Sequence, residues 1–108
     1  MTENEMNKLK QFKIAEQNTL KLIFPQHKIN LEETFQRWDN VIQEKKYLIE
    51  LKNRSFTYEE FINTNGKYKG KPIIEEEKYF ECILKAQELN YKFLYIYYFS
   101  CGSYIIYN

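Results

Sequence analysis

Two acidic residues and a lysine near the middle of the chain have the types and spacing that metal-assisted chemistry requires. Asp39 precedes a short segment of branched residues, and Glu50 and Lys52 follow within a second such segment. The polar and charged residues 43–46 separate the two segments, which predicts a β-hairpin. Side chains alternate along a strand, so Glu50 and Lys52 share one face.

The predicted register brings two carboxylates together. If residue 43 pairs with residue 46, Val41 lies opposite Leu48 and Asp39 lies opposite Glu50, with Cβ atoms about 5 Å apart. At an effective dielectric of about 20, their repulsion is roughly 3 kcal/mol when both are ionised. A raised pKa, a neighbouring ammonium or a divalent cation would compensate for this repulsion.

Mg²⁺ is the cation that suits this pattern, because it binds one or two carboxylates together with waters and substrate phosphates. Asp39 and Glu50 are therefore candidate Mg²⁺ ligands, and Lys52 supplies the neighbouring ammonium. The alternative is a charged, solvated hairpin in which these three residues have no chemical role.

The order Asp39, hairpin, Glu50-Leu51-Lys52 resembles the signature of the PD-(D/E)XK nuclease superfamily, which has the restriction-endonuclease-like fold. The proline that usually precedes the first acid is Trp38 here. The resemblance is to a small phage-type or Holliday-junction-resolvase-like member, and it implies that Asp39, Glu50 and Lys52 are catalytic. It also implies that Mg²⁺ or Mn²⁺ is held by Asp39, Glu50 and the Leu51 carbonyl. The implied fold is α/β, a mixed β-sheet flanked by an N-terminal and a central helix.

An amphipathic helix is predicted from about Glu3 to Phe24, before Pro25. With Leu9 at 0° and about 100° per residue, Glu16 falls near 340°, within the apolar stripe. The rest of the stripe is Phe12, Leu20 and Ile23. A carboxylate there either has a partner or lies at the rim, where it reaches water or a lysine. Many members of the superfamily direct a glutamate of the first helix into the metal site, so the resemblance implies that Glu16 is a metal ligand.

Three further strands are predicted. One lies between Lys28 and Arg37, just after the sole histidine, His27, which is interpreted as a surface residue. Tyr91 to Phe99 has apolar residues on both faces, which is typical of a strand covered on both sides. A turn then leads into a final strand, 104–107.

The densest basic patch follows a predicted short helix, which a Thr57-x-x-Glu60 capping box begins and which runs through Ile62. This patch lies in a loop with two glycines and a proline and consists of Lys67, Lys69 and Lys71, interleaved with Tyr68. Such residues suit phosphate contact and base stacking, although a merely solvated loop explains them equally well. Arg54, on the same predicted face as Lys52, is a candidate phosphate ligand.

A second long helix is predicted over about Ile73 to Leu89, with acidic residues in its first turn that complement the helix dipole. Its predicted inner face consists of Ile73, Phe80, Leu84 and Gln87. In small phage-type members of the superfamily, the helix after the Glu-x-Lys strand opens with a Lys-Tyr pair. Lys78-Tyr79 resembles that pair, which implies a supporting nucleic-acid contact for Lys78, although helical geometry places Lys78 off the predicted apolar face.

The composition favours one folded domain over residues 1–108, with ten Tyr and eight Phe available for a modest core. The formal net charge of +1 means that any affinity for nucleic acid must come from a local patch. Cys82 and Cys101 have no companion ligands nearby and are predicted to be free thiols in a reducing compartment. We expect no signal peptide, membrane span or appended DNA-reading domain.

These features favour a metal-dependent DNA nuclease, with Mg²⁺ or Mn²⁺ as cofactor and DNA as partner. We expect it in the cytoplasm of a bacterial or phage-infected cell, as a homodimer or within a larger assembly. The second hypothesis is an inactive relative that binds DNA or protein, such as a phage accessory protein. Retention of Asp39, Glu50 and Lys52 argues against decay. The third is a purely structural α/β domain.

Overall fold

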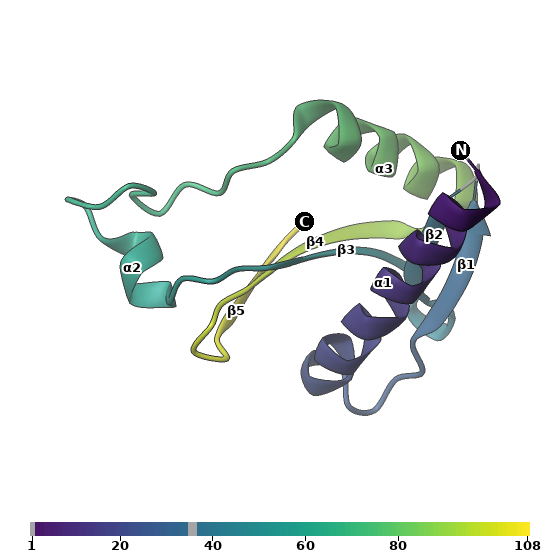
Figure 1. The fold of residues 1–108 in the computed structure, drawn as a ribbon, viewed down its shortest axis with the longest axis horizontal. Helices are drawn as coiled ribbons and strands as arrows, with labels where there is room; N and C mark the ends of the chain where they lie inside the picture. The colour runs from purple at the N-terminus through teal and green to yellow at the C-terminus, as the bar shows by residue number, and fades with distance from the viewer. Residues whose placement is uncertain (1, 35–36) are drawn as a thin grey trace.

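The computed structural model describes residues 2–34 and 37–108, which form three helices and a five-stranded sheet (Figure 1). In chain order the elements are α1 (Glu3–Ile23), β1 (Asn30–Thr34), β2 (Arg37–Ile42), a 3-10 turn (Gln43–Lys45), β3 (Tyr47–Asn53), α2 (Tyr58–Ile62), α3 (Glu76–Leu89), β4 (Lys92–Tyr98) and β5 (Tyr104–Tyr107).

The sheet is mixed, with its strands in sequential order. β1, β2 and β3 are antiparallel neighbours, β3 and β4 are parallel, and β5 returns antiparallel to β4. A parallel pair needs a crossover connection, and α3 lies within the one between β3 and β4. Val41 pairs with Leu48, which confirms the predicted hairpin register. The expected mixed sheet flanked by an N-terminal and a central helix is therefore present.

Local sequence explains where the helices begin and end. The Thr2 side chain accepts a hydrogen bond from the backbone N–H of Glu5 and caps α1, which ends before Pro25. Thr57 and Glu60 form the predicted capping box of α2. At the end of α3, Asn90 adopts a left-handed conformation with φ 59°, and its backbone N–H bonds the last carbonyls.

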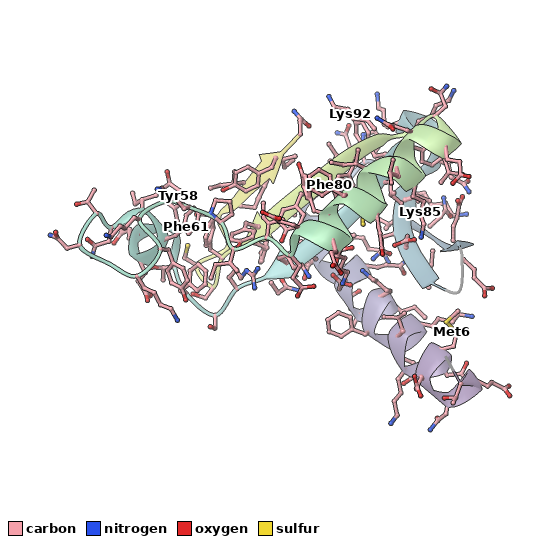
Figure 2. The ribbon with its side chains drawn as sticks, turned by 90° about the horizontal axis from the view of Figure 1, so that it is seen from above. Met6, Tyr58, Phe61, Phe80, Lys85 and Lys92 are labelled. Carbon is pink, nitrogen blue, oxygen red and sulfur yellow. The ribbon has the colours of Figure 1, made fainter. Side chains whose placement is uncertain are left out.

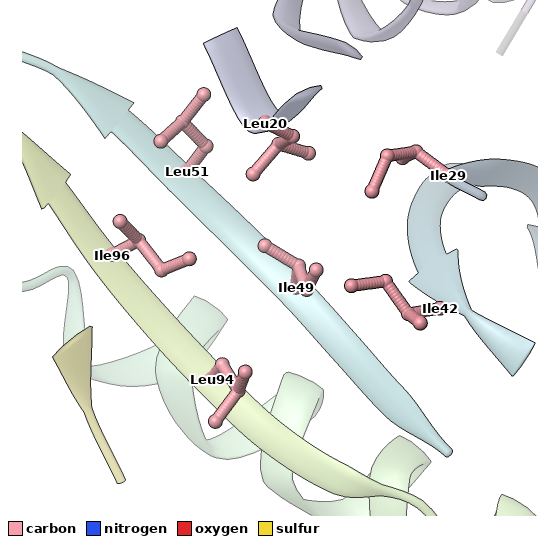
Figure 3. Close-up of a cluster of buried hydrophobic side chains, with 7 residues drawn as sticks. All are labelled: Leu20, Ile29, Ile42, Ile49, Leu51, Leu94 and Ile96. Carbon is pink, nitrogen blue, oxygen red and sulfur yellow. The ribbon is translucent and has the colours of Figure 1, made fainter. Parts of the chain in front are cut away.

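Helix α1 covers one face of the sheet (Figures 1 and 3). Leu20 packs there against Ile49 and Leu51 of β3 and against the side chains of β4 that point the same way, Leu94 and Ile96. All five side chains are almost completely buried. This apolar cluster fixes the position of α1 relative to β3, and so the position of any polar side chain that α1 directs toward the sheet.

The opposite face carries the aromatic side chains and α3. Tyr95 and Tyr97 of β4 pack with Phe61 and Phe99, while Ala86 of α3 contacts the β2–β3 hairpin. Since Leu94 and Ile96 lie on the α1 side, β4 is covered on both faces as its sequence predicted.

The predicted inner face of α3 is wrong. The helix begins at Glu76 and not at Ile73. Phe80 and Leu84 are 59% and 64% exposed, and Figure 2 shows Phe80 on the outer side of the helix. Ile73 and Gln87 are exposed as well. The buried side chains of α3 are Cys82, Lys85 and Ala86. Small and cationic residues therefore face the sheet, because this side of the sheet presents carboxylates.

The remaining sequence predictions concern the cysteines, the sole histidine and membrane crossing. Cys82 is buried and Cys101 is exposed, and no disulfide joins them. His27 is partly exposed, with Nδ1 2.5 Å from Oε1 of Glu44 in the hairpin turn. Within residues 2–34 and 37–108, the helices are too short or too polar to cross a membrane.

Candidate functional site

Three buried carboxylates gather where the β2–β3 ladder ends. The ladder runs from the Ile42–Tyr47 pair to the Asn40–Ile49 pair, so Asp39 and Glu50 lie one residue beyond it. Asp39 is 2% exposed and Glu50 is 4% exposed. Glu16, which α1 contributes from the other side, is also 4% exposed. Local sequence placed each acid on its element, and the packing of α1 on β3 brings Glu16 toward Glu50.

Lys13 holds two of these acids. Its Nζ donates a hydrogen bond to Oε2 of Glu50 at 3.4 Å and lies 3.5 Å from Oε1 of Glu16. The side chain of Asn40 donates a hydrogen bond to the Lys13 carbonyl at 3.2 Å, which fixes this turn of α1 against β2. Lys13 is 3% exposed, so its ammonium is enclosed between the two carboxylates.

Three more lysines complete the cluster. Lys52 and Lys78 place Nζ 3.5 Å and 3.6 Å from Oε1 of Glu50. Lys85 donates to Oδ2 of Asp39 at 3.5 Å from the α3 side of the sheet. Lys78 therefore lies at the acid site, although helical geometry placed it off the predicted apolar face.

These contacts change the electrostatic picture predicted for the hairpin. Asp39 and Glu50 are not a bare pair of repelling carboxylates, because lysines from both helices and from β3 contact them. The sequence identified Lys52 as one compensating charge. The other three ammonium groups become neighbours only after α1 and α3 dock on the sheet.

Burial and neighbouring charge shift the pKa of two members of the cluster. Burial raises the pKa of Glu16, and the nearby Glu50 raises it further, against the opposing pull of Lys13. Burial alone would lower the pKa of Lys13, but the carboxylates around it, Glu50 first, hold that pKa above its ordinary value. Lys13 is therefore a fully charged ammonium at neutral pH.

Glu16 and Glu50 open to solvent through a groove between α1 and β3. The residues that line it are Leu9, Phe12, Lys13, Glu16, Glu50, Leu51, Lys52, Asn53 and Lys78. Glu50 also lines a small hollow on the α3 side, together with Tyr79, Cys82 and Tyr95. Glu50 is thus the carboxylate common to both spaces, and a small ligand would reach it through the groove.

One observation opposes cation binding by the cluster and another favours it. Among the described residues, no three His, Cys, Asp or Glu side chains are already arranged to hold a metal ion. Oε1 of Glu16 is buried and, despite the nearby Lys13 ammonium, accepts no aligned hydrogen bond from the described residues. That oxygen has unused capacity for a ligand. The Leu51 side chain is buried in the α1-side core, and a ligand role for its carbonyl stays a prediction.

Arg54 has structural partners. Its guanidinium lies 4.5 Å from the centre of the Tyr97 ring and donates hydrogen bonds to the Tyr97 hydroxyl at 3.1 Å and to the Ile73 carbonyl at 3.4 Å. Tyr97 in turn bonds the backbone of Ile73. Arg54 thereby ties the segment before α3 to β4, and phosphate binding by Arg54 stays a prediction.

The loop lysines lie apart from the acid cluster. Lys67, Lys69 and Lys71 are exposed in the loop between α2 and α3, at the opposite end of the molecule from α1 (Figure 1). Tyr68 stacks on Phe56, with ring centres 4.1 Å apart and an angle of 22° between the rings. Phe56 thus covers one face of the Tyr68 ring, and the Lys67 ammonium lies 5.6 Å from the ring centre. Base stacking by Tyr68 stays a prediction.

Sequence reasoning missed Lys13, Asn40 and Lys85. A signal was present for Lys13, because the same helical wheel places it near 40°, close to Leu20 near 20°. Phe12, near 300°, is 63% exposed and lies outside the buried stripe that it was expected to join. Lys78, Cys82 and Lys85 are spaced to lie on one face of α3. The large hydrophobic residues of the helix lie on another face, so the hydrophobic pattern did not predict that Lys85 is buried.

No protein-family model, curated protein or solved structure matches the chain. Membership of the PD-(D/E)XK superfamily therefore stays a prediction. The site itself consists of three buried acids and four lysines near the end of the β2–β3 ladder.

Proposed function

We propose that the protein is a metal-dependent nuclease that hydrolyses phosphodiester bonds in DNA, built on a restriction-endonuclease-like core. The observation that carries this proposal is the burial of Glu16 and Glu50 beside a groove, with Asp39 also buried one residue beyond the same end of the β2–β3 ladder. Burying charges costs free energy that their mutual attraction need not repay, so such a cluster is a weak device for stability. Buried ionisable groups with shifted pKa values beside a cleft are typical of functional sites.

The residues fit a divalent cation with few protein ligands. Mg²⁺ keeps several waters and needs one or two carboxylates, which Asp39 and Glu50 would supply. Glu16 would complete the set through its poorly satisfied Oε1, and the Leu51 carbonyl is a further candidate. A bound cation would acidify a water and offset charge on the phosphate.

The lysines at Glu50 have complementary tasks in this proposal. Lys52, partly exposed in the groove, would orient the attacking water or offset the developing negative charge. Lys78 would contact a phosphate from the α3 side of the groove. Further phosphate contacts would come from Lys67, Lys69 and Lys71, since the net charge of +1 provides no general attraction.

One observation favours a second function, a non-catalytic DNA- or protein-binding module. The four lysines already compensate the three acids without any cation. A catalytically inactive protein could keep these ion pairs because they hold α1 and α3 on the sheet.

The test combines a thermal shift with DNA cleavage. Mg²⁺ or Mn²⁺ at millimolar concentration should raise the melting temperature, because a ligand that binds only the folded state stabilises it. The same ions should support nicking of a supercoiled plasmid, and EDTA should abolish it. Asp39→Asn should lose both effects, whereas Lys52→Ala should keep much of the thermal shift and lose the nicking.

A matched control is Glu59→Gln, which removes an exposed acid of α2 and should behave as the unchanged protein. DNA binding without nicking under any metal condition would favour the non-catalytic module. Absence of both a thermal shift and nicking would remove the nuclease proposal.

A further inference from the structure

We propose that Lys13 is an internal counter-ion that holds Glu16 and Glu50 together in the metal-free protein and must leave its place before a divalent cation binds them. This inference rests on the proposed function, because it concerns how the same site accepts its cation. It makes Lys13 a positioning residue that sets the cation affinity of the site.

The contacts of Lys13 distinguish it from the other lysines. Its Nζ lies within 3.5 Å of both Glu16 and Glu50 and approaches Oε2 of Glu50. Lys52 and Lys78 approach the other oxygen, Oε1. The Lys13 ammonium thus occupies the space between the two acids, where a cation that used both of them would lie.

The side chain can leave without unfolding the helix. Its backbone carbonyl is anchored by Asn40, so this turn of α1 stays on β2 whatever the side chain does. Lys13 also lines the groove beside Leu9 and Phe12, and Phe12 is 63% exposed. The flexible four-carbon stem can therefore carry the ammonium outward along the groove to water.

The Lys13 ammonium and a divalent cation cannot both lie between Glu16 and Glu50. Two positive groups within a few ångström repel strongly at the low effective dielectric of a buried site. The protein consequently keeps its acids compensated when no metal is present, at the expense of cation affinity. Removing the ammonium should reverse both effects.

The experiment measures cation binding to the protein alone, without DNA. Isothermal titration with Mn²⁺ and with Mg²⁺ at pH 8 compares the unchanged protein with Lys13→Met. We expect Lys13→Met to melt at a lower temperature without metal. We also expect it to bind the cation about tenfold tighter or more, since a buried unit charge a few ångström away is removed.

Two variants provide the controls. Lys78→Met removes an ammonium that also contacts Glu50, but this side chain is 37% exposed and screened by water, so cation affinity should change far less. Lys13→Arg keeps a cation at the position and should keep the weak affinity. Should Lys13→Met fail to fold, Lys13→Gln carries the same comparison.

The outcomes separate this inference from the proposed function. A cation that binds the unchanged protein but binds Lys13→Met no tighter overturns the counter-ion role and leaves the nuclease proposal standing. Binding to Lys13→Met alone supports the counter-ion role and counts against a working nuclease in the unchanged protein. Absence of binding to both overturns both.

Discussion

Glu50→Gln tests whether the lysines stabilise the buried acids in the metal-free protein. Asp39 and Glu50 taken as a bare repelling pair would make the loss of one charge neutral or stabilising. The structure reverses this expectation, because Lys13, Lys52 and Lys78 all contact the Glu50 carboxylate. Replacing it with a neutral amide should therefore destabilise the fold.

The magnitude follows from the burial of each lysine. At 3.4 Å and an effective dielectric of about 20, the attraction between Lys13 and Glu50 is about 5 kcal/mol. Lys13 keeps Glu16 as a partner, and burying a neutral amide costs less than burying a carboxylate, so much of this attraction is offset. Lys52 and Lys78 are 22% and 37% exposed and add little, since exposed ion pairs contribute about 0–1 kcal/mol. We expect a net loss of about 2–3 kcal/mol.

Thermal and urea unfolding followed by circular dichroism, in EDTA at pH 7, would measure this loss. For a domain of this size it corresponds to a fall of about 10–20 °C in melting temperature. Glu59→Gln, which removes an exposed acid, should change the free energy of unfolding by less than about 0.5 kcal/mol. A Glu50→Gln protein as stable as the unchanged one would refute the reasoning, because it would mean that acid repulsion outweighs the lysine contacts.

Two further outcomes are expected. The raised pKa of Glu16 means that the folded state binds more protons than the unfolded state between the ordinary carboxyl pKa and the raised one, so stability should fall as pH rises through that window. Glu16→Gln should lack this fall in stability. Urea unfolding of both proteins at pH 4 and at pH 8 would measure the difference. An equal pH dependence in both proteins would contradict a buried carboxylate at position 16. Changing Lys67, Lys69 and Lys71 together to Gln should weaken DNA binding and flatten its salt dependence in fluorescence-anisotropy titrations, because each lost phosphate contact releases fewer counterions. An unchanged salt slope would mean that this loop is merely solvated.

Local patterns predicted most of the secondary structure. Apolar residues on both faces located β4, and the turn after it located the final strand. The even-length hairpin turn fixed the pairing of Val41 with Leu48. The capping box located α2, and the apolar stripe located α1 with Glu16 upon it. Each of these features depends on residues within a few positions of one another, so the sequence alone was sufficient.

The inner face of α3 and the lysine contacts depended on the tertiary structure. A hydrophobic pattern assumes that a buried face is apolar, which would direct Phe80 and Leu84 inward. The sheet instead presents carboxylates, and α3 turns Lys85 toward Asp39, 46 residues away in the chain. Lys13 likewise meets Glu50 across 37 residues. A buried lysine needs a paired charge to be stable. Here the paired acid lies on a distant strand, and the two meet only when the helices pack on the sheet.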